Sequence, residues 1–182
     1  MVLNPTLEQK AALLRASSPG PRYTSYPPAT AFTEAFGKKE FLQCLEAARE
    51  VREPFALYVH VPFCQQRCAF CACNVIITRK AEPKEEYLDA LETEAALLAK
   101  SLGQRRQINR LHFGGGTPLS LGPEGLRRLW NRLSEHFEID PRGELAIEVD
   151  PRTTSLEHFE FLRELGFSRV SFGVQDLDAD VQ

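Results

Sequence analysis

Hydrophobic and polar positions follow a helical period in the first part of the chain. Apolar residues recur at helical spacing over residues 6–16 and again over residues 38–52, so a helix is expected in each range. Between them, residues 17–30 hold four prolines and a glycine, which predict an extended arm. Cys44 falls on the apolar face of the second helix and is therefore expected to be a core residue.

From residue 54 onward, short apolar segments alternate with longer amphipathic segments. We expect strands at residues 55–63, 108–113, 145–149 and 168–175, and helices at residues 83–101, 123–137 and 155–165. This alternation predicts an α/β fold of about four βα units, with a parallel sheet that curls towards a TIM-like (β/α) barrel. We therefore expect an N-terminal arm and helix over residues 1–53 and a partial barrel over residues 54–182.

Residues that could bind a ligand or take part in catalysis follow each predicted strand. Residues 64–73 come after the first strand and residues 114–118 after the second. Glu148 and Gln175 lie at the ends of the third and fourth strands. Because functional groups of (β/α) folds gather where the strands end, we expect all four features on one rim.

Overall charge and composition narrow the classes of function. The 182 residues carry a formal net charge of −3 with no basic excess, so we expect no nucleic-acid partner. No apolar run approaches the ~18 residues of a membrane-spanning helix, and the N-terminus lacks the pattern of a secretory signal. We therefore expect a cytoplasmic protein without a membrane partner. In a reducing cytosol, the cysteines clustered at residues 64–73 indicate metal binding or catalysis rather than disulfides.

Cys64, Cys68 and Cys71 have a spacing that suits an iron–sulfur cluster. Such clusters are usually held by four cysteines, so three thiolates leave one iron of a [4Fe–4S] cubane open. An open iron can chelate the amino and carboxylate groups of S-adenosylmethionine, and one electron then breaks a carbon–sulfur bond to give a 5′-deoxyadenosyl radical. The spacing therefore predicts both a [4Fe–4S] cluster and S-adenosylmethionine.

Two other interpretations of these cysteines fit less well. A structural zinc site usually pairs two knuckles separated by about a dozen or more residues. The chain offers no second knuckle, and His60 and His112 lie inside predicted strands. Buried free thiols are the other interpretation, but Gln65, Gln66 and Arg67 make this segment too polar for a typical core.

Cys73 is a further cysteine that we do not expect to bind the cluster. As a ligand it would close the open iron, and its position two residues after Cys71 makes simultaneous binding awkward. We expect it to lie near the active site without binding iron. The alternative is a small buried residue that happens to be cysteine.

The segment HFGGGTP, residues 112–118, and the two rim residues Glu148 and Gln175 each allow two interpretations. Consecutive glycines let a backbone approach the aminoacyl part of S-adenosylmethionine, but a tight βα turn also explains them. A carboxylate or amide at the rim can bind a ribose or an amino group, or it can pair with an arginine. Tyr58 and His60 alternate in the first strand, so they share one side, which we expect to be the barrel interior.

The segments LYVHVPFCQQRCAFCAC, HFGGGTP, IEVDP and FGVQ resemble, in order and spacing, those of the oxygen-independent coproporphyrinogen III oxidases, a family of radical S-adenosylmethionine enzymes. The arm PRYTSYPPAT, residues 21–30, is similar to the N-terminal arm of that family. The resemblance covers residues 20–182 and implies the N-terminal half of a radical S-adenosylmethionine barrel. It implies an oxidoreductase that converts two propionates of coproporphyrinogen III to vinyl groups, giving protoporphyrinogen IX in haem biosynthesis.

The same resemblance assigns roles to residues. Cys64, Cys68 and Cys71 would bind the cluster, and Cys73 would be a catalytic cysteine near a second S-adenosylmethionine, because the family binds up to two. Contacts to S-adenosylmethionine would come from Tyr58, Phe70, Gly115, Gly116, Thr117, Glu148 and Gln175. The implied partners are a porphyrinogen substrate, an electron donor and an electron acceptor, the last two unidentified.

Two alternative functions accompany this resemblance. Haem-binding chaperones of the same superfamily share the cluster motif and GGGTP, but they lack the cysteine at position 73 and the RYTSYP arm, so the oxidase is favoured. Members of the oxidase family continue through further βα units after the position of Gln182. We therefore expect the chain to be a fragment or a truncated product, and a non-catalytic remnant is the third hypothesis.

Overall fold

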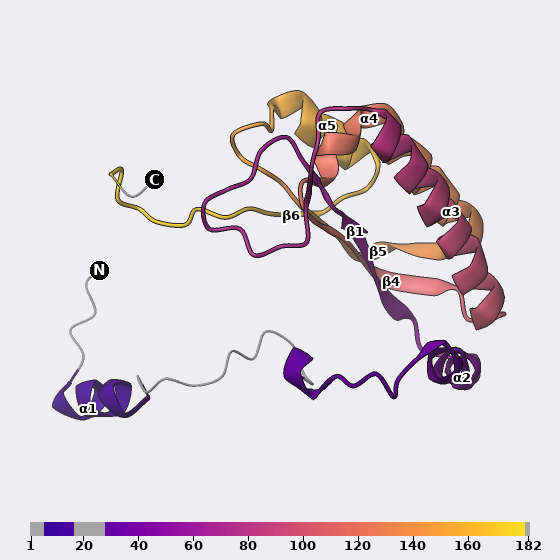
Figure 1. The fold of residues 1–182 in the computed structure, drawn as a ribbon, viewed down its shortest axis with the longest axis horizontal. Coiled ribbons are helices and arrows are strands. Elements are labelled where there is room, and N and C mark those ends of the chain that lie inside the picture. The colour runs from indigo at the N-terminus through magenta and orange to yellow at the C-terminus, as the bar shows by residue number, and fades with distance from the viewer. Residues whose placement is uncertain (1–5, 17–27, 181–182) are drawn as a thin grey trace. The chain divides into compact units, whose positions relative to one another are not determined.

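The computed structural model describes residues 6–16 and 28–180, and the chain divides into two compact units, Met1–Phe41 and Leu42–Gln182 (Figure 1). The described elements that begin in the first unit are α1 (Leu7–Ala16), a 3₁₀ helix η1 (Ala29–Ala31) and α2 (Lys38–Ala48), which continues into the second unit. The helix expected at residues 6–16 is confirmed by α1. The arm expected at residues 17–30 lies outside the described residues except at its end, and the division at residue 53 stays a prediction.

The prediction that Cys44 is a core residue is wrong. Its side chain is exposed, and α2 ends at Ala48 instead of reaching residue 52. No residue of α2 is fully buried, and only Leu45 and Ala48 pack partly against the core of the second unit. The helix therefore buries a narrow stripe that passes beside Cys44.

Four parallel strands form the main sheet of the second unit. They are β1 (Phe55–Val61), β4 (Gln107–Gly115), β5 (Glu138–Glu148) and β6 (Arg169–Ser171), in the spatial order β1-β4-β5-β6. A separate parallel pair consists of β2 (Phe63–Cys64) and β3 (Ile76–Ile77), which flank the cysteine segment. The parallel α/β architecture expected from the sequence is confirmed, with three strand–helix units followed by a fourth strand.

The strand β5 begins seven residues before the predicted strand at residues 145–149. The register with β4 is regular at Ile139 and again at Glu144, with an irregularity between them. The intervening Asp140-Pro141-Arg142-Gly143 carries turn residues, which hide a strand from a pattern of alternating apolar positions. At Gly143, a Cβ atom would collide with the Asn109 carbonyl oxygen, so the bulge depends on glycine at this position.

Three helices cover one face of the sheet. They are α3 (Glu82–Leu102), α4 (Gly122–His136) and α5 (Leu156–Glu164), and the 3₁₀ helix η2 (Pro118–Leu121) precedes α4. Proline stands in the first turns of α3 and α4, where its missing N–H costs no hydrogen bond. A capping box between Ser155 and His158 begins α5. None of the helices that the structure describes is long and apolar enough to cross a membrane.

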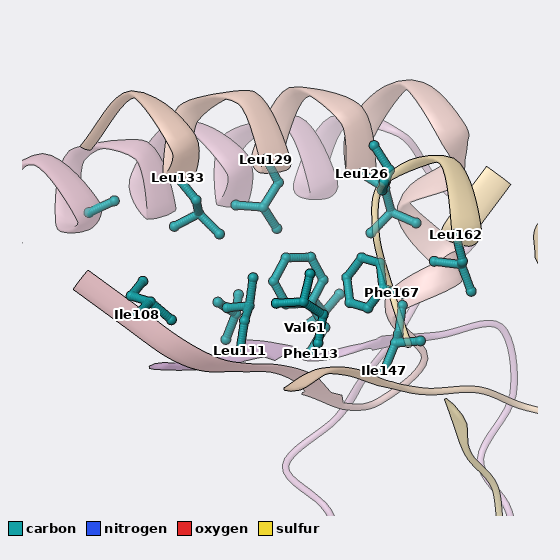
Figure 2. Packing of buried hydrophobic residues seen from close by; sticks show 14 of the residues in the cluster. Val61, Ile108, Leu111, Phe113, Leu126, Leu129, Leu133, Ile147, Leu162 and Phe167 are labelled. Atoms are coloured by element: carbon teal, nitrogen blue, oxygen red, sulfur yellow. The ribbon is translucent and has the colours of Figure 1, made fainter. Parts of the chain in front are cut away.

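The core lies between the helices and the sheet (Figure 2). Phe113 of β4 and Ile147 of β5 are fully buried beneath Leu126 and Leu129 of α4. Burying a side chain of this size stabilises a fold by about 1.5–3 kcal/mol. Side chains alternate between the two faces of a strand. In β1, Val59 therefore points to the helices and is buried, whereas Tyr58 lies on the opposite face and is exposed.

The fourth strand is shorter than the sequence predicts. Only residues 169–171 of the expected range 168–175 pair with β5, and Phe172 and Val174 are exposed. Gln175 therefore does not end a strand. It lies four residues beyond β6 with a left-handed backbone φ of 67°.

Candidate active site

The carboxyl ends of the parallel strands meet at one edge of the sheet. Val61 of β1 pairs with Gly115 of β4. Hydrogen bonds from Gly116 N to Val61 O, at 2.8 Å, and from Thr117 N to Phe63 O, at 2.9 Å, join the loop after β4 to the segment after β1. The segments that the sequence places after the first two predicted strands therefore share one rim.

The cysteine loop, residues 64–73, is anchored at its base. Cys64 ends β2, and its carbonyl oxygen accepts a hydrogen bond of 2.9 Å from Thr78 N. Within the loop, Cys71 N donates to Cys68 O at 3.1 Å and makes a turn. The three cysteines are partly buried and free of disulfides.

These three thiols have the donor chemistry of a [4Fe–4S] cluster. No three Cys, His, Asp or Glu side chains among the described residues are grouped to hold a single metal ion. A cubane makes a different demand, because its thiolates bind separate iron atoms. Unpaired, partly accessible thiols on one short loop fit that demand, and the assignment of Cys64, Cys68 and Cys71 as ligands stays a prediction.

The glycine loop, residues 114–116, packs closely against β1 and the segment that follows it. Gly115 has a φ of 112°, and a Cβ atom there would lie 2.6 Å from the His60 ring. A Cβ atom on Gly116 would lie 2.8 Å from the Pro62 backbone. The tight-turn interpretation is therefore sufficient for these glycines, and their contact with S-adenosylmethionine stays a prediction.

Glu148 is held by hydrogen bonds at the end of β5. Its Oε2 accepts a bond of 3.0 Å from Gly115 N, and its Oε1 accepts a bond of 3.2 Å from His112 Nε2. A Cβ atom on Gly114 would lie 2.9 Å from this carboxylate. Among the described residues the side chain that pairs with Glu148 is that of His112, whereas an arginine partner was one of the two interpretations that the sequence allowed. His112 was missed as a site residue, although it lies only two residues before the first of the three glycines.

Tyr58 and His60 share one side of β1, as the alternation predicts. Their Oη and Nδ1 atoms are 3.0 Å apart, and His60 Nε2 lies 3.0 Å from Asn74 O. Because a carbonyl only accepts, Nε2 of a neutral His60 carries the hydrogen and Nδ1 accepts from the tyrosine hydroxyl. Partial burial raises the pKa of Tyr58, and the charge of Glu148 adds to the rise.

Cys73 lies next to Cys71 and is exposed. Desolvation is the first cause that raises the pKa of its thiol, and the Cys71 thiol and the Glu148 carboxylate raise it further. The Cys71 thiol and the Glu148 carboxylate are therefore close enough to act on the Cys73 thiol. Its role as a catalytic cysteine stays a prediction.

Of three further residues predicted to contact S-adenosylmethionine, one makes a contact within the rim and two are exposed. Thr117 Oγ1 lies 3.6 Å from Cys64 Sγ and so connects the glycine loop with the cysteine loop. Phe70 stands between the second and third cysteines with its side chain 63% exposed. Gln175 is also exposed, and no described contact brings it to the rim.

Arg152, in the loop after β5, is a rim residue that the sequence did not reveal. Its Nη2 donates a hydrogen bond of 3.2 Å to Cys68 Sγ. The same guanidinium binds both carboxylate oxygens of Asp150 and holds the pKa of that group below its ordinary value. The only sequence signal was its place four residues after Glu148, beyond the same strand end.

Residues 58–182 match the model of the radical SAM superfamily. The chain is 47% identical over 163 residues to the oxygen-independent coproporphyrinogen III oxidase of Escherichia coli K12 and 44% identical over 165 residues to that of Pseudomonas aeruginosa. These alignments cover 90% of the chain but 35% and 36% of the relatives.

A solved structure, that of coproporphyrinogen III oxidase (HemN) from E. coli, described as a radical SAM enzyme, superposes with a TM-score of 0.81 at 44% identity. It matches 94% of this chain, and the chain covers 38% of it. The resemblance predicted from the sequence motifs is therefore confirmed, over a little more than a third of the relatives' length. The matched superfamily model covers most of the sheet, the cysteine loop and the glycine loop, and the chain belongs to the radical SAM superfamily.

Proposed function

We propose that this chain carries the cluster and S-adenosylmethionine sites of an oxygen-independent coproporphyrinogen III oxidase. The observation that carries the proposal is the meeting of the cysteine loop, the glycine loop and Glu148 at one rim. The relatives that carry this name are 37–47% identical to the chain over their matched part. A porphyrinogen is then the substrate, and a cytoplasmic location remains a prediction.

Cys64, Cys68 and Cys71 would hold the cluster, and Glu148 and the backbone of the glycine loop would bind S-adenosylmethionine. When bound, the cluster would supply a single electron and S-adenosylmethionine would supply the radical that abstracts hydrogen. The glycine loop carries no side chains that would obstruct a ligand at the rim, and Gly115 N orients Glu148. Thr117 links this loop to Cys64 through the contact between its hydroxyl and the Cys64 sulfur.

The remaining predicted contacts would enclose the reacting groups. Tyr58 and Phe70 are exposed aromatic side chains next to the rim and can cover a bound nucleoside and exclude water. Cys73 and Gln175 belong to the same proposal, Cys73 beside a second S-adenosylmethionine. Converting each propionate to a vinyl group releases carbon dioxide and removes one hydrogen atom and one electron, so an electron acceptor is required as well as a donor.

The first test is anaerobic reconstitution with iron and sulfide. The wild-type chain should turn brown and bind about four irons per chain, as a [4Fe–4S] cluster requires. Replacing Cys64, Cys68 or Cys71 with Ala should remove most of the cluster absorbance. The matched control is Cys44→Ala, because Cys44 is exposed on α2 and outside the cysteine loop, and it should retain the absorbance. Stoichiometric zinc without iron in anaerobically purified protein would falsify the proposal.

The second test separates the oxidase from a haem-binding chaperone. Cys73→Ser in a chain extended to the length of its relatives should keep the cluster and lose turnover of coproporphyrinogen III. Loss of the cluster in this variant would show that Cys73 is a ligand instead. Stable binding of added haem, without formation of protoporphyrin, would favour the chaperone.

A further inference from the structure

Arg152 makes a contact that the proposed chemistry does not use. Its hydrogen bond to Cys68 Sγ joins residues 84 positions apart in the sequence. The arginine comes from the loop between β5 and α5, and the cysteine comes from the loop between β2 and β3. The contact therefore connects two loops of the rim directly at a predicted cluster ligand.

The guanidinium of Arg152 is fixed in position by its neighbour. Nε donates to Asp150 Oδ1 at 2.9 Å, and Nη2 donates to Asp150 Oδ2 at 2.7 Å. This two-point pairing orients the plane of the guanidinium and leaves the second hydrogen of Nη2 for the sulfur. Asp150 is fixed in turn, because Thr154 Oγ1 donates to its carbonyl oxygen at 2.7 Å.

The chain contains the same tripeptide at a second place. Asp140-Pro141-Arg142 repeats the sequence of Asp150-Pro151-Arg152. In both, the backbone N–H of the arginine donates to the aspartate Oδ1, at 2.9 Å and 3.0 Å. Arg142 is 91% exposed, and its side chain lies 3.6 Å from its aspartate, whereas Arg152 is 52% exposed and closely paired. The local turn alone therefore does not explain the placement of Arg152, and the thiol of Cys68 distinguishes the two sites.

A hydrogen bond to a ligand sulfur has a known effect on an iron–sulfur cluster. Reduction adds negative charge that spreads onto the sulfur atoms, so a donor at sulfur stabilises the reduced form more than the oxidised form. The carboxylate of Asp150 offsets part of the positive charge of Arg152, which leaves the directed N–H as the main local influence. We propose that Arg152 donates a hydrogen bond to the Cys68 thiolate and raises the reduction potential of the cluster, an inference that rests on the proposed cluster site.

The test is a redox titration of the anaerobically reconstituted chain, followed by electron paramagnetic resonance of the reduced form. Arg152→Met removes the donors and keeps a long side chain, and Arg142→Met is the matched control from the repeated tripeptide. We expect Arg152→Met to bind wild-type amounts of iron with a lower midpoint potential, and Arg142→Met to keep the wild-type potential. Arg152→Lys retains a cation without the two-point pairing, so its potential should fall between those of Arg152→Met and the wild type.

Equal potentials in the wild type, Arg152→Met and Arg152→Lys would overturn the inference. If Arg152→Met binds no iron and Arg152→Lys keeps the wild-type potential, Arg152 only anchors the loop and the inference also fails. Failure of the proposed function looks different, because the wild-type chain itself would then bind no cluster.

Discussion

At the scale of single residues, Gly115 has both a positive φ and no room for a side chain, whereas Gly122 has only the positive φ. The φ of Gly115 is 112°, and an added Cβ would strike the His60 ring. Gly122 also has a positive φ, of 72°, but an added Cβ would meet nothing within 4 Å. The two positions therefore allow backbone strain to be measured with and without a steric clash.

We expect Gly122→Ala to lower the free energy of unfolding by about 1–3 kcal/mol, the usual cost of backbone strain. Gly115→Ala should cost more, about 2–4 kcal/mol, because the clash with His60 adds to the strain. Urea unfolding of the cluster-free chain measures both. Equal losses in the two variants would show that the contact with His60 relaxes freely.

His112 is the second residue with a separable role. Its Nε2 donates to Glu148, and its ring stacks on Tyr58 with centroids 5.7 Å apart. His112→Phe keeps an aromatic ring and removes the hydrogen bond. We expect about tenfold weaker binding of S-adenosylmethionine to the reconstituted chain, because a bond to a charged group contributes on the order of 1.5 kcal/mol.

Equilibrium binding of S-adenosylmethionine checks the role of His112. His136→Phe is the control, because His136 lies in the last turn of α4 and away from the rim. Unchanged affinity in His112→Phe would mean that Gly115 N alone positions Glu148.

The sequence predicted much of the rim but not its internal contacts. Cysteine spacing and the glycine run are local patterns, so their loops could be located without a structure. The pairing of His112 with Glu148 depends on the register of β4 against β5, and the contact of Arg152 with Cys68 depends on two loop conformations. Neither is encoded in a short window of sequence.

At the scale of secondary-structure elements, the helices were more predictable than the strands. Amphipathic periodicity places α3, α4 and α5 to within one residue at each end. The strand β5 was predicted too short because of its bulge, and β6 was predicted too long because residues 172–175 continue the apolar alternation without pairing. The two-residue strands β2 and β3 are too short for any periodic signal.

The contact between α3 and α4 has a polar part that can be tested. Arg128 of α4 binds three carboxylates of α3, those of Glu85, Asp89 and Glu92, and this pairing raises the arginine pKa. We expect Arg128→Met to lower the free energy of unfolding by about 1 kcal/mol, since exposed ion pairs contribute little individually.

Salt distinguishes this electrostatic loss from lost packing. At about 1 M salt the screening length falls to about 3 Å, so the difference between Arg128→Met and the wild type should shrink. Urea unfolding at low and high salt measures it, with the highly exposed Arg142→Met as the control. A loss that is independent of salt would assign the effect to the aliphatic stem of Arg128.

At the scale of the whole molecule, one face of the sheet is covered by helices and the other carries the site. Tyr58 is 54% exposed on that second face, and Phe172 and Val174 beyond β6 are exposed as well. The chain spans 35–38% of the length of the curated relatives it matches. The groups proposed to bind S-adenosylmethionine are thus present, while little of the described structure encloses them.

We therefore expect the 182-residue chain, reconstituted and reduced, to cleave S-adenosylmethionine slowly at most and to form no protoporphyrinogen IX from coproporphyrinogen III. Directed hydrogen abstraction requires a positioned substrate and the exclusion of water, and an exposed site provides neither. Anaerobic incubation with a strong reductant, followed by chromatography of 5′-deoxyadenosine and of the oxidised porphyrins, measures both reactions. A version extended to the length of its relatives is the positive control. If the 182-residue chain forms more than one protoporphyrin per protein molecule, the chain alone is a sufficient catalyst and this expectation is wrong.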